Sequence, residues 1–123
     1  MILVDTSIWV DHLRAGEPAL ADLLVGGRVA THPFVLGELS LGNLANREVV
    51  LGSLADLPSV TAASDTEVLR FITNAKLHGL GIGYVDAHLL AAARLTPGVA
   101  IWTRDKRLKA AAKAIGLASH LNR

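Results

Sequence analysis

Cysteine is absent from the 123-residue sequence, and aromatic residues are few, with two Trp, two Phe and one Tyr. The lack of cysteine excludes a disulfide framework and any thiolate metal site, and it fits a reducing compartment, so we expect a cytoplasmic protein. The N-terminus has no basic region and meets an acid at Asp5, which argues against a signal peptide. No uncharged apolar run approaches the roughly 20 residues that a membrane-spanning helix needs. We therefore expect a soluble protein with no membrane partner.

The length of 123 residues and the mass of 12.9 kDa predict one domain over residues 1–123, large enough to fold without metal or disulfide. Hydrophobic residues make up 51% of the chain and the mean hydropathy is +0.41, which is high for a small domain. Two interpretations stay open: some apolar surface meets a partner, or the core is rich in alanine and leucine. Trp9 and Trp102 are expected in the core, and packing is favoured over base stacking for Tyr84.

Charge is unevenly distributed along a chain whose net charge is only +1. Residues 1–103 carry six bases against ten acids, whereas residues 104–123 carry six bases and the single acid Asp105. A basic end on an otherwise acidic chain attracts phosphate. The alternative is a solvent-exposed helix with cations toward its C-terminal end, and charge alone favours this alternative.

Short apolar segments alternate with longer segments that carry helix start and stop signals, which predicts an α/β fold around a parallel sheet. The predicted strands span residues 2–4, 28–32, 59–62, 99–103 and 117–120. The predicted helices span residues 7–13, 16–27, 33–44, 46–57, 64–79, 84–95 and 104–116. Ligands bind beyond the carboxyl ends of the strands in such sheets, so residues that follow strands are the first candidates for a site.

Two acids follow predicted strands. Asp5 comes directly after the first strand, and Asp105 lies between the strand 99–103 and the last helix. Each also fits a helix N-cap, and for Asp5 alone the cap is the favoured interpretation. Thr103 competes with Asp105 for the cap of the last helix.

Two further acids lie on predicted helices among apolar residues. Glu38 has Phe34 and Leu41 as neighbours about one turn away, where a carboxylate is costly unless it is paired or binds a metal. Its alternative is a glutamate at the edge of the core that reaches water. Asp86 shares one side of its helix with Leu89, and it is equally explained as a first-turn acid favoured by the helix dipole.

A parallel sheet can bring strand ends and the adjoining helix starts together, so these four acids are candidates for one cluster. Two like charges about 4 Å apart repel by on the order of 4 kcal/mol at an effective dielectric constant near 20, so a cluster requires a cation. Without cysteine or a His-x-x-x-His spacing, an all-oxygen cluster favours a hard divalent ion, Mg²⁺ or Mn²⁺. Because Mg²⁺ commonly shares its coordination with substrate phosphate, the cluster indicates phosphate chemistry.

The segments ILVDTSIWVD, GELSLG, YVDAHLLAAA and WTRDKRL, in this order and spacing, resemble those of PIN-domain ribonucleases, and most of all VapC toxins of toxin–antitoxin pairs. The resemblance extends from Ile2 to about Ile115. It implies a PIN-like, Rossmann-like three-layer α/β/α sandwich with a central parallel sheet of about four or five strands. It also implies a type II toxin, an endoribonuclease that hydrolyses tRNA, rRNA or mRNA with one or two Mg²⁺ or Mn²⁺ ions.

The resemblance assigns site residues position by position. The positions matching the family's metal-binding acids are Asp5, Glu38, Asp86 and Asp105. The positions matching its hydroxyl residues, implied to orient a carboxylate or a water, are Thr6, Ser7 and Thr103. The family further implies a homodimer and a cognate VapB-like antitoxin whose tail lies over the acidic cleft.

Four bases around Asp105 are candidates for holding RNA phosphates beside the metal: Arg104, Lys106, Arg107 and Lys109. They cannot all share one helix face, so some are ordinary solvent-exposed charges.

Two other functions stay open. A phosphoryl-accepting receiver domain fits the length and fold class, with Thr103 and Lys106 as sensing residues. Such a domain ordinarily has two adjacent acids after its first strand, whereas Thr6 and Ser7 follow Asp5. The other alternative is a catalytically weak PIN fold that serves mainly as a binding module.

Overall fold

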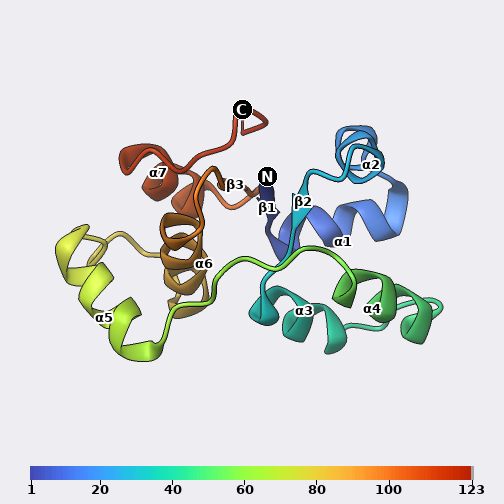
Figure 1. Cartoon of the computed structure of the whole chain (residues 1–123), viewed down its shortest axis with the longest axis horizontal. Helices are drawn as coiled ribbons and strands as arrows, with labels where there is room; N and C mark the ends of the chain where they lie inside the picture. Colours follow the sequence, from blue (N-terminus) through green and yellow to red (C-terminus); the bar gives the residue numbers. More distant parts are fainter. Residues whose placement is uncertain (123) are drawn as a thin grey trace.

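A computed structural model describes residues 1–122 and shows a small parallel sheet with helices on either side (Figure 1). The strands are β1 (Ile2–Val4), β2 (Val29–Ala30) and β3 (Ala100–Trp102), in the order β2-β1-β3 across the sheet. The helices are α1 (Thr6–Ala15), α2 (Pro18–Val25), α3 (Pro33–Ser40), α4 (Arg47–Ala55), α5 (Asp65–Asn74), α6 (Tyr84–Leu95) and α7 (Lys106–Ala114). In Figure 1, α1 to α4 lie on one side of the strands and α5 to α7 on the other. The predicted α/β class and the parallel pairing are confirmed.

The sheet has three strands within residues 1–122, fewer than the sequence predicted. The segments 59–62 and 117–120 extend its two edges by one parallel bridge each, Thr31 with Ser59 and Ile101 with Ala118. Neither pairing continues, because the amides that follow bond elsewhere. The Thr61 amide donates to the Thr96 hydroxyl at 2.9 Å, and the Leu121 amide donates to the Ser119 hydroxyl at 3.0 Å.

The core forms around β1 and α6. β1 is entirely apolar, and Leu3 and Val4 are fully buried, as expected for a central parallel strand covered on both faces. Every residue from Ala87 to Ala93 in α6 is buried, and the alanines among them let α6 lie close to both α5 and β3. Trp9 and Trp102 are buried, as predicted.

Apolar residues also remain on the surface. Val25, Leu41 and Val49 are 92%, 90% and 71% exposed. The high hydrophobic content of the sequence therefore includes apolar side chains outside the core. Within residues 1–122, no helix is both long enough and apolar enough to cross a membrane.

Candidate active site

The carboxyl ends of β1 and β3 lie side by side, because Val4 pairs with Trp102 in the parallel register. The residue after β1 is Asp5, which is buried, and the residue after β3 is Thr103. The Thr103 hydroxyl donates a 2.7 Å hydrogen bond to Asp5 Oδ2, and the Ser7 hydroxyl donates a 2.8 Å bond to the same oxygen. The strand ends therefore form the floor of a polar site, as the rule for parallel sheets predicts.

Asp5 occupies the N-cap position of α1, but its side chain makes no cap hydrogen bond. The carboxylate turns instead to the hydroxyls of Ser7 and Thr103. Asp5 thus has the N-cap position that was favoured for this residue alone, but its carboxylate does not make the hydrogen bond of an N-cap.

Glu38 lies on α3 and is exposed. It therefore reaches water, as expected for a glutamate at the edge of the core. Its carboxylate is nevertheless tied to the first helix, because the Thr6 hydroxyl donates to Glu38 Oε1 at 2.7 Å. Thr6 directly follows Asp5 in the chain, so this bond fixes α3 next to the end of β1.

Asp86 and Asp105 both lie at helix N-termini. Asp86 Oδ2 accepts a hydrogen bond at 3.1 Å from the amide of Gly83, the N-cap residue of α6. Asp105 is the N-cap of α7, and its Oδ1 accepts the Leu108 amide at 2.9 Å. Asp105 thus has the capping role weighed from the sequence, and Asp86 is the first-turn acid that the helix dipole favours. Thr103 does not cap α7.

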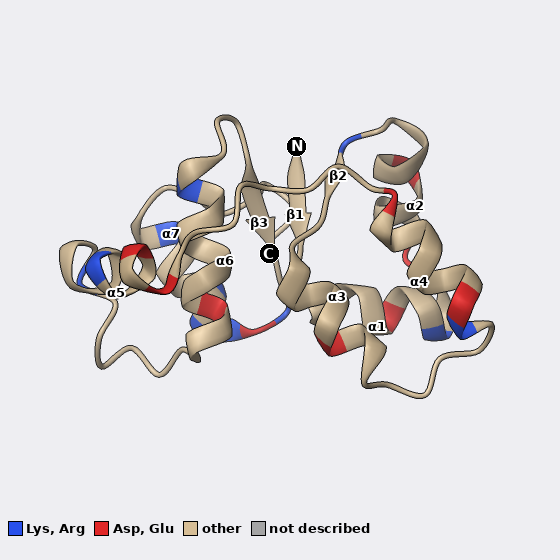
Figure 2. Cartoon of the chain, turned by 60° about the horizontal axis from the view of Figure 1, so that its bottom comes forward, with Lys and Arg blue, Asp and Glu red and all other residues tan. Residues whose placement is uncertain are grey.

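The other three acids influence the protonation of Asp86. The pKa of the Asp86 carboxyl is raised above its ordinary value, first by burial and then by repulsion from Asp5, Asp105 and Glu38, against the lowering effect of the Gly83 hydrogen bond. In Figure 2, acidic residues appear on α3, on α6 and on the segment between β3 and α7. Asp86 is thus influenced by the other three acids, and their assembly around one metal ion stays a prediction.

Thr103 connects the acids on the two sides of the site. Its hydroxyl, which donates to Asp5, also accepts the Asp105 amide at 3.0 Å and lies 3.5 Å from the Ser7 hydroxyl. Its own amide donates to Asn122 Oδ1 at 3.0 Å. Asn122 was not predicted from the sequence, where an amide near the end of the chain gives no signal of a contact with the site.

Arg104 is paired within the protein. Its guanidinium donates to Asp11 Oδ2 and to Glu17 Oε2, both at 2.6 Å, and its amide donates to the Ser7 hydroxyl at 3.1 Å. Hydrogen bonding to Asp11 is the first cause of a raised Arg104 pKa. These contacts join α1 and the start of α2 to the segment after β3. Because its charge is balanced by these acids, Arg104 is the weakest of the four predicted RNA contacts.

The other bases are placed differently. Within residues 1–122, Lys106 and Arg107 form no ion pair, and the Arg107 side chain packs over Gly81. Lys109 lines a cavity of about 380 Å³ together with Arg104 and other residues. The structure thus leaves Lys106 and Arg107 as exposed cations next to Asp105.

The donor set fits a hard divalent cation. Four carboxylates and three hydroxyls are all-oxygen ligands, which Mg²⁺ and Mn²⁺ prefer. Each carboxylate keeps one oxygen that accepts no hydrogen bond from another residue among 1–122: Asp5 Oδ1, Glu38 Oε2, Asp86 Oδ1 and Asp105 Oδ2. Across the described chain, no three acids or histidines are drawn together as closely as a chelated ion requires. Side-chain movement would have to accompany binding.

Comparison with known proteins places the chain in a family. The family model of the PIN domain matches residues 2–114, and the chain belongs to the PIN domain family. The chain is also 48% identical over 118 residues to Ribonuclease VapC32 of Mycobacterium tuberculosis strain CDC 1551 / Oshkosh, covering 96% of this chain and 95% of that protein. Ribonuclease VapC32 of strain ATCC 25618 / H37Rv matches with the same identity and coverage. The resemblance drawn from the sequence motifs is confirmed, and it leaves the receiver alternative without support.

Proposed function

We propose that the protein is a Mg²⁺- or Mn²⁺-dependent endoribonuclease and the toxin of a type II toxin–antitoxin pair. The proposal is supported by the placement of the acids: Asp5 follows β1, Glu38 is bonded to Thr6 beside it, and Asp86 is repelled by Asp5, Asp105 and Glu38. The similarity to proteins named Ribonuclease VapC32 supports RNA as the substrate.

Asp5, Glu38, Asp86 and Asp105 would hold the ion through the oxygens left without hydrogen bonds. A bound divalent cation supplies Lewis-acid activation of water and stabilises charge on phosphoryl oxygens. The protein's own hydroxyls fix the carboxylates. Ser7 and Thr103 both bond Asp5 Oδ2, which orients the other Asp5 oxygen, and Thr6 does the same for Glu38. Such outer contacts typically tune metal affinity or activity by about 10- to 100-fold.

The proposed RNA contacts are Lys106 and Arg107, with Lys109 farther along α7. Lys106 and Arg107 are exposed next to Asp105, and a phosphate held there lies beside the acids. Arg104 contributes indirectly, because its pairs with Asp11 and Glu17 hold the segment that carries Asp105.

A VapB-like antitoxin is proposed as the inhibitory partner, and a homodimer as the assembly. An apolar groove supports a protein partner. It lies between α1 and the segment that joins α3 to α4, has a volume of about 600 Å³, and is lined by residues that include Val10, Leu13 and Val50. An antitoxin arginine that reached the carboxylates would form charge-assisted hydrogen bonds there and compete with the metal.

The test is cleavage of a labelled RNA with Mg²⁺ or Mn²⁺ by the wild-type protein and by Asp5→Asn. We expect EDTA to abolish cleavage and Asp5→Asn to lower it about 100-fold or more, since a buried carboxylate of the proposed metal site loses its charge. Asp22→Asn, which removes an exposed acid on α2, is the matched control and should cleave normally. Full activity in Asp5→Asn would overturn the proposal. Absence of metal binding by calorimetry would favour the catalytically weak binding module.

A further inference from the structure

Two exposed aromatic side chains are joined by a buried histidine near the acids. Of the five Phe, Trp and Tyr residues, Phe34 and Tyr84 are the exposed ones, at 38% and 46%. The ring of His88, which is 3% exposed, contacts both, with centroid distances of 4.6 Å to Phe34 and 4.7 Å to Tyr84. The three residues form an aromatic strip, Phe34–His88–Tyr84, that runs from α3 to α6.

Contacts from neighbouring residues fix the rings of this strip. Asp65 Oδ1 accepts the Tyr84 hydroxyl at 3.1 Å and lies 3.1 Å from His88 Nε2. On the other side, the Phe34 amide donates to His32 Nδ1 at 2.9 Å, and the His32 ring packs against the Phe34 ring with centroids 5.1 Å apart. The rings are thus oriented before any ligand arrives, which lowers the entropy lost on binding.

The strip is backed by a neutral ring. His32 Nδ1 accepts a hydrogen bond, so Nε2 carries the hydrogen, and burial followed by the nearby His88 lowers the pKa of His32 to about 4. His32 is therefore uncharged at neutral pH. The three rings of the strip are tilted against one another, by 56° between Phe34 and His88 and 89° between Tyr84 and His88, so Phe34 and Tyr84 present separate rings. An exposed, uncharged aromatic ring suits a flat base better than it suits a phosphate.

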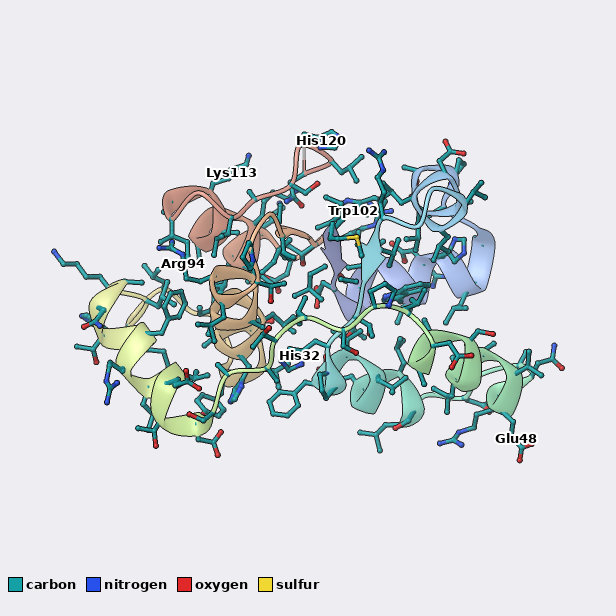
Figure 3. All side chains as sticks on the ribbon, in the orientation of Figure 1. His32, Glu48, Arg94, Trp102, Lys113 and His120 are labelled. Carbon is teal, nitrogen blue, oxygen red and sulfur yellow. The ribbon has the colours of Figure 1, made fainter. Side chains whose placement is uncertain are left out.

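The strip borders the acidic site. Phe34 precedes Glu38 by about one turn of α3, and Tyr84 opens α6 two residues before Asp86. Figure 3 labels His32 where the start of α3 faces α6. A strand whose phosphate reached the acids would bring its neighbouring bases close to these two helix starts.

We propose that Phe34 and Tyr84 form a stacking platform for an unpaired RNA base beside the phosphate that is cleaved. The platform rests on the proposed ribonuclease function and adds a substrate preference to it. Bases in a single strand are free to stack on aromatic side chains, whereas bases in a duplex are already covered on both faces. The protein should therefore bind unpaired RNA segments. Phe34 and Tyr84 are the binding residues in this proposal.

The experiment is a fluorescence anisotropy titration of labelled oligoadenylate with the full chain in EDTA, so that no cleavage occurs. We expect Phe34→Ala and Tyr84→Ala each to weaken binding by about 5- to 100-fold, the usual range for loss of one base–aromatic stack. Tyr84→Phe keeps the ring and should bind within about twofold of wild type. Val25→Ala removes an exposed apolar side chain on α2 and is the matched control, with unchanged affinity expected.

An abasic ribose-phosphate strand of the same length separates stacking from phosphate binding. We expect wild type and Tyr84→Ala to bind this strand equally, because it keeps the charges and lacks the bases. Equal binding of oligoadenylate by wild type and Tyr84→Ala overturns the platform, as does an undetectable affinity of the wild-type protein for it. If Phe34→Ala fails to fold, the pair Tyr84→Ala and Tyr84→Phe decides the question.

Cleavage with Mn²⁺ distinguishes failure of the platform from failure of the proposed function. A protein that cleaves RNA and binds oligoadenylate independently of Tyr84 loses only the platform. A protein that does not cleave RNA, yet binds oligoadenylate through Tyr84, keeps the platform as a single-strand binding site and loses the ribonuclease assignment.

Discussion

The two sides of the site hold their acids by different means. Asp5 and Glu38 come from the side of the sheet with α1 to α4, and side-chain hydroxyls bond both. Asp86 and Asp105 come from the side with α5 to α7, and backbone amides at helix N-termini bond both. A hydroxyl is removed by one substitution, whereas a backbone amide is not. The first pair therefore depends on neighbouring side chains, and the second pair is fixed by the fold and also caps its own helices.

The largest effect on stability should come from Thr103→Val, which removes the buried hydroxyl that bonds Asp5. Asp5 loses a 2.7 Å donor and the Asp105 amide loses its acceptor. We expect cleavage to fall by about 10- to 100-fold. The free energy of unfolding, measured by urea denaturation, should fall by about 1–3 kcal/mol.

Thr103→Ser is the control, because it keeps the hydroxyl and should recover most of both losses. Equal activity in Thr103→Val and wild type would show that Asp5 does not depend on this hydroxyl.

An intermediate effect on stability should separate the two roles of Asp105. Asparagine is as good an N-cap as aspartate, so Asp105→Asn should unfold within about 0.5 kcal/mol of wild type, whereas Asp105→Ala should lose about 1 kcal/mol. Both variants lose the carboxylate and should lose cleavage and metal affinity alike. Calorimetric metal titration and urea denaturation of the same samples check this. Normal cleavage by Asp105→Asn would reduce the residue to a helix cap.

The smallest effect should be a gain in thermal stability for Asp86→Asn without metal. The pKa of the folded carboxyl is raised, by burial first and by the other three acids next. Protonated Asp86 therefore contributes to the stability of the folded protein. This contribution is complete below the pKa of Asp86 in the unfolded chain, and it is lost as pH rises through the pKa in the folded protein. Ionised Asp86 thus destabilises the metal-free protein at neutral pH, and an uncharged side chain that still accepts the Gly83 amide should raise Tm.

Thermal unfolding in EDTA at neutral and at acidic pH measures this gain. It should vanish at acidic pH, where wild-type Asp86 is already protonated. Asp22→Asn is again the control, with no pH-dependent gain expected. A decrease in Tm of the same size at both pH values would contradict the repulsion among the four acids.

The sequence predicted the parts of the site that depend on local pattern. Short apolar strands followed by Asp5 and by Asp105 indicated the edge of the sheet, and Glu38 among apolar residues indicated the facing helix. Contacts between distant segments were not predictable. The pairs of Arg104 with Asp11 and Glu17, and the bond from Thr103 to Asn122, depend on how helices and loops pack.

Exposure was equally hard to predict for Tyr84. Its apolar ring near the start of a helix suggested packing, whereas nearly half of its surface is exposed. The sequence also overestimated the sheet, because the amides of Thr61 and Leu121 donate to side-chain hydroxyls and not to a neighbouring strand.

The bond between Thr103 and Asp5 spans 98 residues of sequence. A polypeptide grows from its N-terminus, so Asp5 leaves the ribosome long before the strand that completes its surroundings. Contacts of such separation also form late in folding, because their loop-closure entropy is high. A partly synthesised chain consequently has three of the acids but no assembled site. The contacts of Asp5 are therefore completed only after the strand β3 and Thr103 have been synthesised.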